Sequence, residues 1–124
     1  MEVNQWEILE IWKKGIELTK TIYAITEKFP KHETFGLGSQ IQRAMVSVPS
    51  NIAEGALRQY KKEFLQFLHL ARGSLGEVIT QLEVAKELEY IDEETTINVG
   101  NKLEELMKMI NGTIASLRKN HDLR

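Results

Sequence analysis

The 124-residue sequence contains no cysteine, so it offers neither a disulfide framework nor a thiolate zinc site. It also has no run of about 18 apolar residues, which excludes a helix that spans a membrane. The first ten residues lack a basic segment followed by an apolar run, so we expect no secretory signal and a cytoplasmic protein. The net charge of −2 argues against a generic polyanion-binding domain, which is usually strongly basic.

Prolines are also few, and the two present are Pro30 and Pro49. No stretch alternates apolar and polar residues for long enough to form a strand, so the pattern predicts an all-α protein. Pro30 should end the first helix, because the residue before a proline avoids the helical region. Pro49 lies inside the second helix, where a proline costs about 3 kcal/mol. We expect one proline-kinked helix, since its side-chain stripes continue across Pro49; a stop near Val48 followed by a restart is the alternative.

Apolar residues recur at three- and four-residue steps through four segments of the chain. The predicted helices cover residues 6–29, 36–56, 61–90 and 92–119, with Asp92 as the N-cap of the last. Short connectors between long helices predict an up-down-up-down four-helix bundle, with residues 1–124 as a single domain. Gly73 and Gly76 each cost the third helix about 1 kcal/mol, so we expect a close helix–helix crossing there.

The second helix carries an unusual polar stripe in place of the Lys and Glu that are typical of a solvent face. It consists of short hydroxyls and amides with one Arg and one Glu, which indicates hydrogen bonding in a partly buried setting. The third helix has polar positions at matching steps. The predicted polar network consists of Gln40, Arg43, Ser47, Ser50, Asn51, Glu54, Ser74, Glu77 and Gln81.

Antiparallel pairing of these two helices around a turn near residues 59–60 would place Arg43 opposite Glu77. We therefore predict an ion pair between these two side chains inside the network. One interpretation of the network is a ligand or nucleotide site between the helices. The interpretation that we favour is structural, because buried polar groups in some proteins fix a helix register or a subunit interface.

Several segments carry a pattern that extends over nearly the whole chain: WKKGIELT at 12–19, SQIQRAM at 39–45, SVPSNIAEG at 47–55 and EFLQFLHLARGSLGE at 63–77. In these segments the chain resembles the four-helix-bundle proteins encoded in intervening sequences of bacterial 23S ribosomal RNA genes. It departs from the family pattern at Tyr60, where a small N-capping hydroxyl such as Ser is expected.

The resemblance implies a bundle that associates into a ring-shaped homopentamer. It also implies kinship with the accessory variability protein of diversity-generating retroelements, a basic pentameric bundle that binds nucleic acid and a reverse transcriptase. The implied partners are therefore further copies of the chain, RNA or DNA, and a nucleic-acid enzyme such as a reverse transcriptase. The family has no established catalytic residues, so the resemblance transfers none.

The histidines show no metal-binding pattern, because His32, His69 and His121 fall in a connector, a helix and the C-terminal tail. Without cysteine, nucleophilic catalysis would need a serine with a poised base, and the candidate pair is Ser50 with His69. We therefore expect no metal, no cofactor, no catalytic residue and no enzyme activity.

Charged residues are distributed unevenly along the predicted bundle. The start of the first helix, the turn between the second and third, and the end of the fourth share one end in this topology. The basic residues at that end are Lys13, Lys14, Arg58, Lys61, Lys62, Arg118 and Lys119. The acidic residues at the opposite end are Glu27, Glu33, Glu87, Glu89, Asp92, Glu93 and Glu94.

Two hypotheses of different class follow. In the first, a ring of basic ends binds phosphates with an affinity that falls steeply as salt rises, and the protein is a nucleic-acid or ribonucleoprotein accessory factor. In the second, it is a protein–protein assembly module without a nucleic-acid role, and the charges only complement helix dipoles. Trp6, Trp12, Phe67 and Tyr90 exceed what one slim bundle has to bury, so both hypotheses predict oligomerisation.

Overall fold

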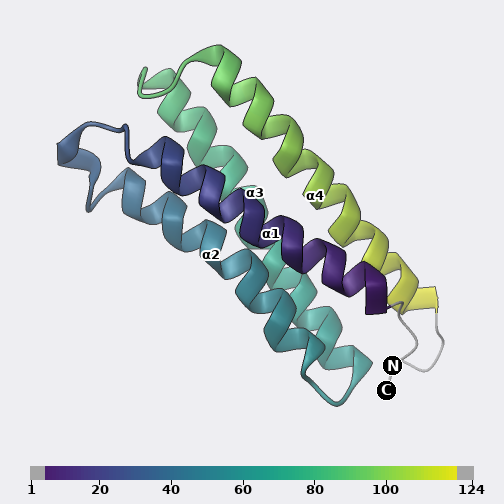
Figure 1. Cartoon of the computed structure of the whole chain (residues 1–124). Helices are drawn as coiled ribbons and strands as arrows, with labels where there is room; N and C mark the ends of the chain where they lie inside the picture. Colours follow the sequence, from purple (N-terminus) through teal and green to yellow (C-terminus); the bar gives the residue numbers. More distant parts are fainter. Residues whose placement is uncertain (1–4, 120–124) are drawn as a thin grey trace.

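The computed structural model describes residues 5–119, and His121 lies outside them. These residues form helices α1 (Gln5–Thr26), α2 (Leu37–Ala56), α3 (Lys61–Glu87) and α4 (Glu93–Lys119), with a short 3-10 helix, η1 (Lys31–Glu33), between α1 and α2. Figure 1 shows the long helices side by side, joined in sequence at alternating ends. The predicted all-α, up-down-up-down four-helix bundle is confirmed.

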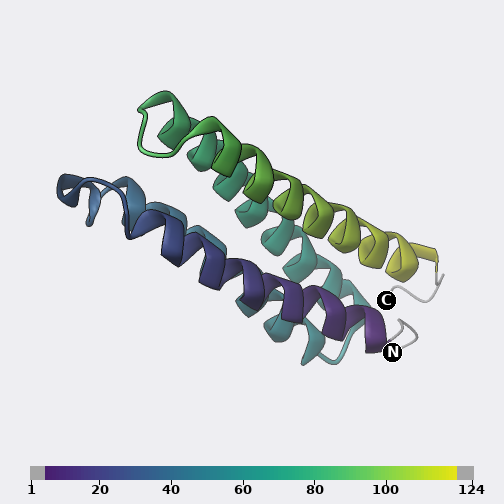
Figure 2. The ribbon, with the colours of Figure 1, turned by 45° about the horizontal axis from the view of Figure 1, so that its top comes forward.

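Each long helix packs against two neighbours. The helix α1 contacts α2 and α4, and α3 contacts the same two helices. Within residues 5–119 the backbones of the diagonal pairs, α1 with α3 and α2 with α4, do not approach each other closely. Figure 2 shows the four-cornered arrangement with α1 and α4 in front. The contact between α2 and α3 is the most extensive of the four, so these two helices form the best-packed side of the bundle.

The core consists of one apolar seam from each long helix, because residues at three- and four-residue steps share one helix face. In α3 the buried residues at these steps are Phe64, Leu68, Ala71, Leu75, Val78, Leu82 and Ala85. The buried seam of α4 likewise contains Val99, Leu103, Leu106, Ile110, Thr113 and Leu117.

Pro49 lies inside α2, and the helix continues through it from Leu37 to Ala56. The helix therefore does not stop near Val48 and restart, while the predicted kink stays a prediction. Gly15 of α1 lies against the buried proline ring, since a β-carbon at Gly15 would be 3.3 Å from Pro49 Cβ. The missing side chain at Gly15 leaves the space that the ring occupies.

The close helix–helix approach occurs at Gly55 and not at the predicted position. A β-carbon on Gly55 would lie 2.7 Å from Phe67 Cβ and 2.8 Å from Phe64 Cδ1. By contrast, β-carbons on Gly73 and Gly76 would have nothing within 4 Å in the described part of the chain. The predicted crossing at these two glycines is therefore wrong, because the tightest packing lies beside the α2–α3 turn and not at mid-helix.

Helix α3 ends at Glu87, earlier than the predicted end at residue 90. Glu89 has a left-handed backbone with φ of 65°, and the N–H groups of Glu89 and Tyr90 donate to the carbonyls of Lys86 and Ala85. This is a Schellman ending, which usually has glycine at the left-handed position. The sequence hides it because a glutamate occupies that position. Helix α1 also ends early, at Thr26 and not at 29.

The Schellman ending brings Tyr90 to the connector between α1 and α2. The Tyr90 hydroxyl donates to Glu33 Oε2 at 2.8 Å, and the backbone N–H of Leu37 donates to Glu33 Oε1 at 2.9 Å. The carboxylate therefore caps the start of α2, where Gly36 has no side chain to do so. These two bonds, the one from Leu37 first, lower the pKa of Glu33 below its ordinary value.

This cap predicts a pH-dependent contribution to stability. Because the folded-state pKa of Glu33 is lowered, its contribution should be fully present above about pH 4.3, the ordinary pKa of glutamate, and be lost as the pH falls through the lower folded-state value. Urea denaturation should show Glu33→Gln less stable than the unsubstituted chain at pH 7, with the difference shrinking below pH 4. A difference that stays constant with pH would contradict this role.

The packing at Gly55 predicts opposite effects for two Gly→Ala substitutions. Gly55→Ala should destabilise the fold by about 1–3 kcal/mol, because Phe64 and Phe67 would have to move. Gly112→Ala should stabilise it by up to about 1 kcal/mol, because that exposed helical position has open space around it. Thermal unfolding followed by circular dichroism measures both, and similar melting temperatures for the two variants would refute the packing argument.

Candidate functional site

A polar groove runs between α2 and α3, lined by Gln40, Arg43, Ala44, Ser47, Ser74, Glu77 and Gln81. At its centre Ser47 Oγ and Ser74 Oγ share a hydrogen bond of 2.5 Å across the two helices. The Asn51 amide donates to Ser47 Oγ at 3.2 Å and to the Ser47 carbonyl at 2.8 Å. The structure therefore brings six of the predicted network residues to one groove and bonds Asn51 to its centre.

The predicted ion pair between Arg43 and Glu77 does not form. Both side chains are exposed, and neither has a hydrogen-bond or ion-pair partner within residues 5–119. They lie on the open edges of the groove, where water can solvate both charges and little is gained by ordering two long side chains. The prediction was wrong because the stripe emerges at the rim of the helix contact and not inside it.

Other members of the predicted network are also exposed in the single chain. Gln40, Ser50 and Glu54 face solvent, and Glu54 Oε2 accepts a hydrogen bond of 3.0 Å from Arg58, four residues further along the chain. Ser50 belongs to a neighbouring hollow on the α1 side of α2. Only the part of the network around Ser47 and Ser74 is hydrogen-bonded across the helices.

Gln81 marks the unfinished part of the polar groove. Its Oε1 atom is buried and has no hydrogen-bond partner in the described part of the chain. A buried acceptor without a donor costs about 1–3 kcal/mol. A donor from outside the chain would remove that cost, which makes the groove a candidate contact surface.

The predicted basic end consists of Lys13, Lys14, Arg58, Lys61, Lys62, Arg118 and Lys119. Figure 1 shows the start of α1, the α2–α3 turn and the end of α4 at the same end of the bundle. Lys62, Arg118 and Lys119 are exposed there. Arg58 is partly engaged, since its guanidinium pairs with Glu54 and lies 4.7 Å from the centre of the Phe67 ring.

Lys14 does not belong to the basic end in the folded chain. Its amino group pairs with Glu105 of α4, part-way along the bundle. The side chain of Lys14 is also only partly exposed, and Glu105 neutralises its charge locally. Lys13, one residue earlier, is exposed. The basic surface is therefore concentrated on the α2–α3 turn and the end of α4.

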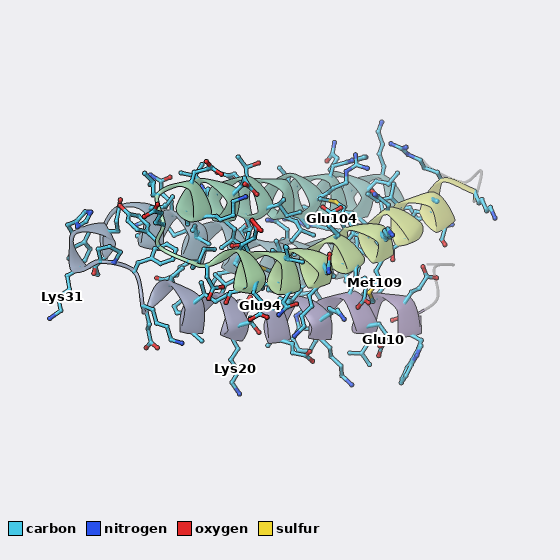
Figure 3. The ribbon with its side chains drawn as sticks, turned by 90° about the horizontal axis from the view of Figure 1, so that it is seen from above. Glu10, Lys20, Lys31, Glu94, Glu104 and Met109 are labelled. Atoms are coloured by element: carbon cyan, nitrogen blue, oxygen red, sulfur yellow. The ribbon has the colours of Figure 1, made fainter. Side chains whose placement is uncertain are left out.

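The acidic end forms at the α1–α2 and α3–α4 connectors. In Figure 3, Lys31 marks this end of the bundle and Glu10 lies toward the other. Asp92 Oδ1 accepts the backbone N–H of Thr95 at 2.7 Å, which confirms its predicted role as a cap of α4. The Thr95 bonds lower the pKa of Asp92, because they favour its charged form. Glu33 is likewise used as a cap, so part of this acidic cluster is structural.

An apolar face covers the outer side of α1 and α2, lined by Trp12, Ile16, Val46, Pro49 and Ala53. The exposed fraction of the residue is 37% for Trp12, 46% for Ile16 and 39% for Val46. Tyr23, two turns after Ile16 on α1, is 42% exposed. Trp6, at the start of α1, is also largely exposed. Trp12, Ile16 and Tyr23 come from α1 and Val46 comes from α2, and no helix within residues 5–119 covers them.

Sequence reasoning considered His69 only as a base or a metal ligand and missed the polar cluster in which it links Arg118 to Arg72. His69 and Arg72 of α3 and Asn111 of α4 lie in contact with Arg118 or with one another. The three-residue spacing of His69 and Arg72 was visible in the sequence. Their link to α4 was not, because it depends on how α3 and α4 are aligned.

The described residues contain no group of three His, Cys, Asp or Glu side chains that could hold a metal ion. His69 does not pair with Ser50, since its ring nitrogens contact Arg72 and Arg118. None of the described helices combines the length and the apolar character that crossing a membrane requires.

The model of the 23S rRNA-intervening sequence protein family matches residues 7–112. A crystal structure of a protein of unknown function from the S23 ribosomal protein family of Bacteroides thetaiotaomicron VPI-5482 is similar in fold, with a TM-score of 0.82 and 24% sequence identity. That similarity covers 88% of this chain and 98% of the other. No curated protein matches the sequence.

The groove geometry predicts different effects for two of its residues. Arg43→Ala should change the unfolding free energy of the single chain by less than about 0.5 kcal/mol, because Arg43 has no partner within residues 5–119. Ser74→Ala should cost about 1 kcal/mol, because it removes the bond to Ser47. Urea denaturation at low protein concentration measures both. If Arg43→Ala lowered the free energy of unfolding by more than Ser74→Ala, the predicted ion pair between Arg43 and Glu77 would be supported.

Proposed function

Because the chain belongs to the 23S rRNA-intervening sequence protein family, we propose that it acts without catalysis, as a homopentameric four-helix bundle that presents its basic end to nucleic acid. RNA is the ligand that we favour, and a nucleic-acid enzyme such as a reverse transcriptase is the protein partner that the family resemblance adds. Both partners imply a cytoplasmic protein. No cofactor and no metal ion are part of this function.

The observation that carries the proposal is the position of Lys61 and Lys62. They occupy the first turn of α3, where the positive end of the helix dipole disfavours cations by about 0.3–1 kcal/mol. Tyr60 also provides no side-chain cap at that helix start. The helix dipole therefore does not account for lysines at this position, and Lys62, which is exposed, is available to bind phosphate.

The end of α4 adds to the same surface. Arg118 and Lys119 lie in its last turn, where they also complement the helix dipole. The acids at this end include Glu7, Glu10, Glu54 and Glu63, of which Glu54 is already paired with Arg58. Since acidic residues gather at the opposite end, the two ends of the bundle carry opposite charge. Copies arranged in a ring around an axis along the bundle would present one basic face.

Two features support association of the chain with itself. The apolar face leaves Trp12, Ile16 and Val46 substantially exposed, and exposed apolar patches mark interaction surfaces. In the polar groove, Arg43 and Glu77 lack partners and Gln81 Oε1 is buried without a donor within residues 5–119. A neighbouring subunit could cover the first surface and supply partners to the second. The number five comes from the family resemblance.

The second candidate function is a protein–protein assembly module in which nucleic acid plays no part. The exposed apolar face favours it, because that surface would serve a protein partner as well as a second copy of the chain. The two candidates differ in their dependence on the basic end, and one experiment separates them.

We expect charge reversal at the basic end to abolish RNA binding while leaving the assembly intact. In the double variant Lys62→Glu, Lys119→Glu, affinity for a single-stranded RNA should fall more than tenfold at 50 mM salt, and the salt slope should fall by about 0.7 for each phosphate that is no longer neutralised. The matched control Lys31→Glu, Lys102→Glu makes the same charge change at exposed positions away from this end. Fluorescence anisotropy measures affinity, and light scattering measures mass.

Each outcome decides a part of the proposal. Equal affinities for the two double variants would refute a role of the basic end. A pentamer that binds no RNA at any salt concentration would favour the assembly module. A monomer of about 14 kDa would refute the ring.

A further inference from the structure

Four polar side chains from α3 and α4 meet on the side of the bundle opposite the α1–α2 contact. Arg72 Nη1 donates to Asn111 Oδ1 at 2.9 Å, and Arg72 Nη2 lies 2.8 Å from His69 Nδ1. Arg118 Nη2 lies 3.2 Å from His69 Nε2. We refer to Arg72, His69, Asn111 and Arg118 as the arginine–histidine cluster.

The hydrogen bonds of this cluster are incomplete. A neutral imidazole has one acceptor nitrogen and one N–H, whereas both ring nitrogens of His69 face guanidinium donors. If Nδ1 accepts from Arg72 at the shorter distance, Nε2 carries the proton and points at the N–H of Arg118. Two donors then face each other at 3.2 Å without an acceptor. An oxygen atom beside them could accept from both.

The charge of the cluster is also uncompensated. Neither Arg72 nor Arg118 has a carboxylate partner within residues 5–119, and Asn111, the partner of Arg72, is neutral. Partial burial and the two guanidinium groups, Arg72 before Arg118, lower the pKa of His69, which favours the neutral form of the ring. Two permanent positive charges are therefore brought together from two helices, without a carboxylate of the described residues to pair with them.

Glycines leave this cluster open to solvent. Helical side chains point back toward the N-terminus, so a residue covers the surface one turn before its own position. Gly73 lies four residues after His69, and Gly76 lies four residues after Arg72. Larger side chains at these two positions would therefore cover His69 and Arg72. β-Carbons at both glycines would have nothing within 4 Å among residues 5–119. Each glycine costs the helix about 1 kcal/mol without a packing gain among these residues.

We propose that the arginine–histidine cluster binds a phosphate group of a nucleic-acid backbone, with the oxygen atoms seated between Arg72, the His69 Nε2–H and Arg118. Guanidinium groups suit phosphate because they donate several parallel N–H bonds. Donors approach from three side chains on two helices, which matches a tetrahedral oxyanion better than a two-oxygen carboxylate. Gly73 and Gly76 allow a strand to approach the α3 backbone.

This site deepens the function proposed above and rests on it for the source of the phosphate. Arg118 belongs both to this cluster and to the basic end, so the two surfaces are continuous. A strand held by Lys62 and Lys119 at the end of the bundle would continue along the α3–α4 side to Arg72. Free inorganic phosphate has the same chemistry, and the experiment therefore tests both sources.

The first arm of the test follows the histidine rings of the full-length protein by ¹H–¹³C NMR through a pH titration. Sodium phosphate should raise the pKa of His69 relative to sodium chloride at equal ionic strength, because a bound anion offsets the two guanidiniums. His32 serves as the internal reference, and His69→Gln assigns the signal. Arg118→Gln, an exposed position in the last turn of α4, should remove the phosphate effect without unfolding the chain.

The second arm measures affinity for a ten-residue oligouridylate by fluorescence anisotropy. Arg72→Gln should weaken binding about tenfold, since it removes charge-assisted hydrogen bonds to phosphate. The matched control Lys102→Gln removes one positive charge from exposed α4 and should change affinity less than twofold. Circular dichroism checks the fold of each variant, and Arg118→Gln replaces Arg72→Gln if the latter unfolds.

The results distinguish this site from the basic end. RNA binding that falls in Arg72→Gln or Arg118→Gln, together with a phosphate-dependent pKa of His69, supports the proposal. If charge reversal of Lys62 and Lys119 abolishes RNA binding but Arg72→Gln does not weaken it, the proposed function stands and this site is refuted. A phosphate effect on His69 without RNA binding at any salt overturns the nucleic-acid source and the proposed function together.

Discussion

The close contact of α2 with α3 is the constraint on which the other features of this bundle depend. At the turn, Gly55 has no side chain, and Phe64 and Phe67 occupy the space where its β-carbon would be. Two turns further along, Ser47 and Ser74 meet in the same antiparallel register. A larger residue at position 55 would push the helices apart or shift them, and both the groove and the seam of buried side chains would change with it.

That register decides which polar side chains are shared between helices. The apolar stripes of α2 and α3 fill the contact, so the polar stripes emerge at its edges. Short side chains near the contact, such as Ser47 and Ser74, reach each other, whereas the long and charged Arg43 and Glu77 extend into water. The same helix α3 presents His69 and Arg72 on its other side, toward α4. Its buried face thus separates two polar edges with different chemistry.

The topology also places basic segments at one end of the bundle and acidic segments at the other. Alternating helix directions bring the α2–α3 turn and the end of α4 together, although about 60 residues separate them in the sequence. Helix dipoles account for Glu93, Glu94, Arg118 and Lys119, but not for lysines at the start of α3. Within residues 5–119, surfaces without partners lie on α1–α2, in the α2–α3 groove and beside α3–α4, and the association and nucleic-acid binding proposed above would cover them.

The sequence by itself determined the helices, their buried seams, the Asp92 cap and the order in which the ends meet. These features follow from a local rule, because residues three and four apart share a helix face and a capping side chain bonds a backbone group within the next turn. The end of α3 could not be predicted, because Glu89 adopts the left-handed conformation at a position that usually has glycine. Only the tertiary structure decided that Arg43 and Glu77 stay apart, that Lys14 joins Glu105, and that Arg72 and Arg118 converge on His69. Such contacts depend on the stagger between helices, where a shift of one residue moves a side chain by about 1.5 Å along the axis and about 100° around it. The periodicity of a single helix therefore does not predict the stagger between two helices.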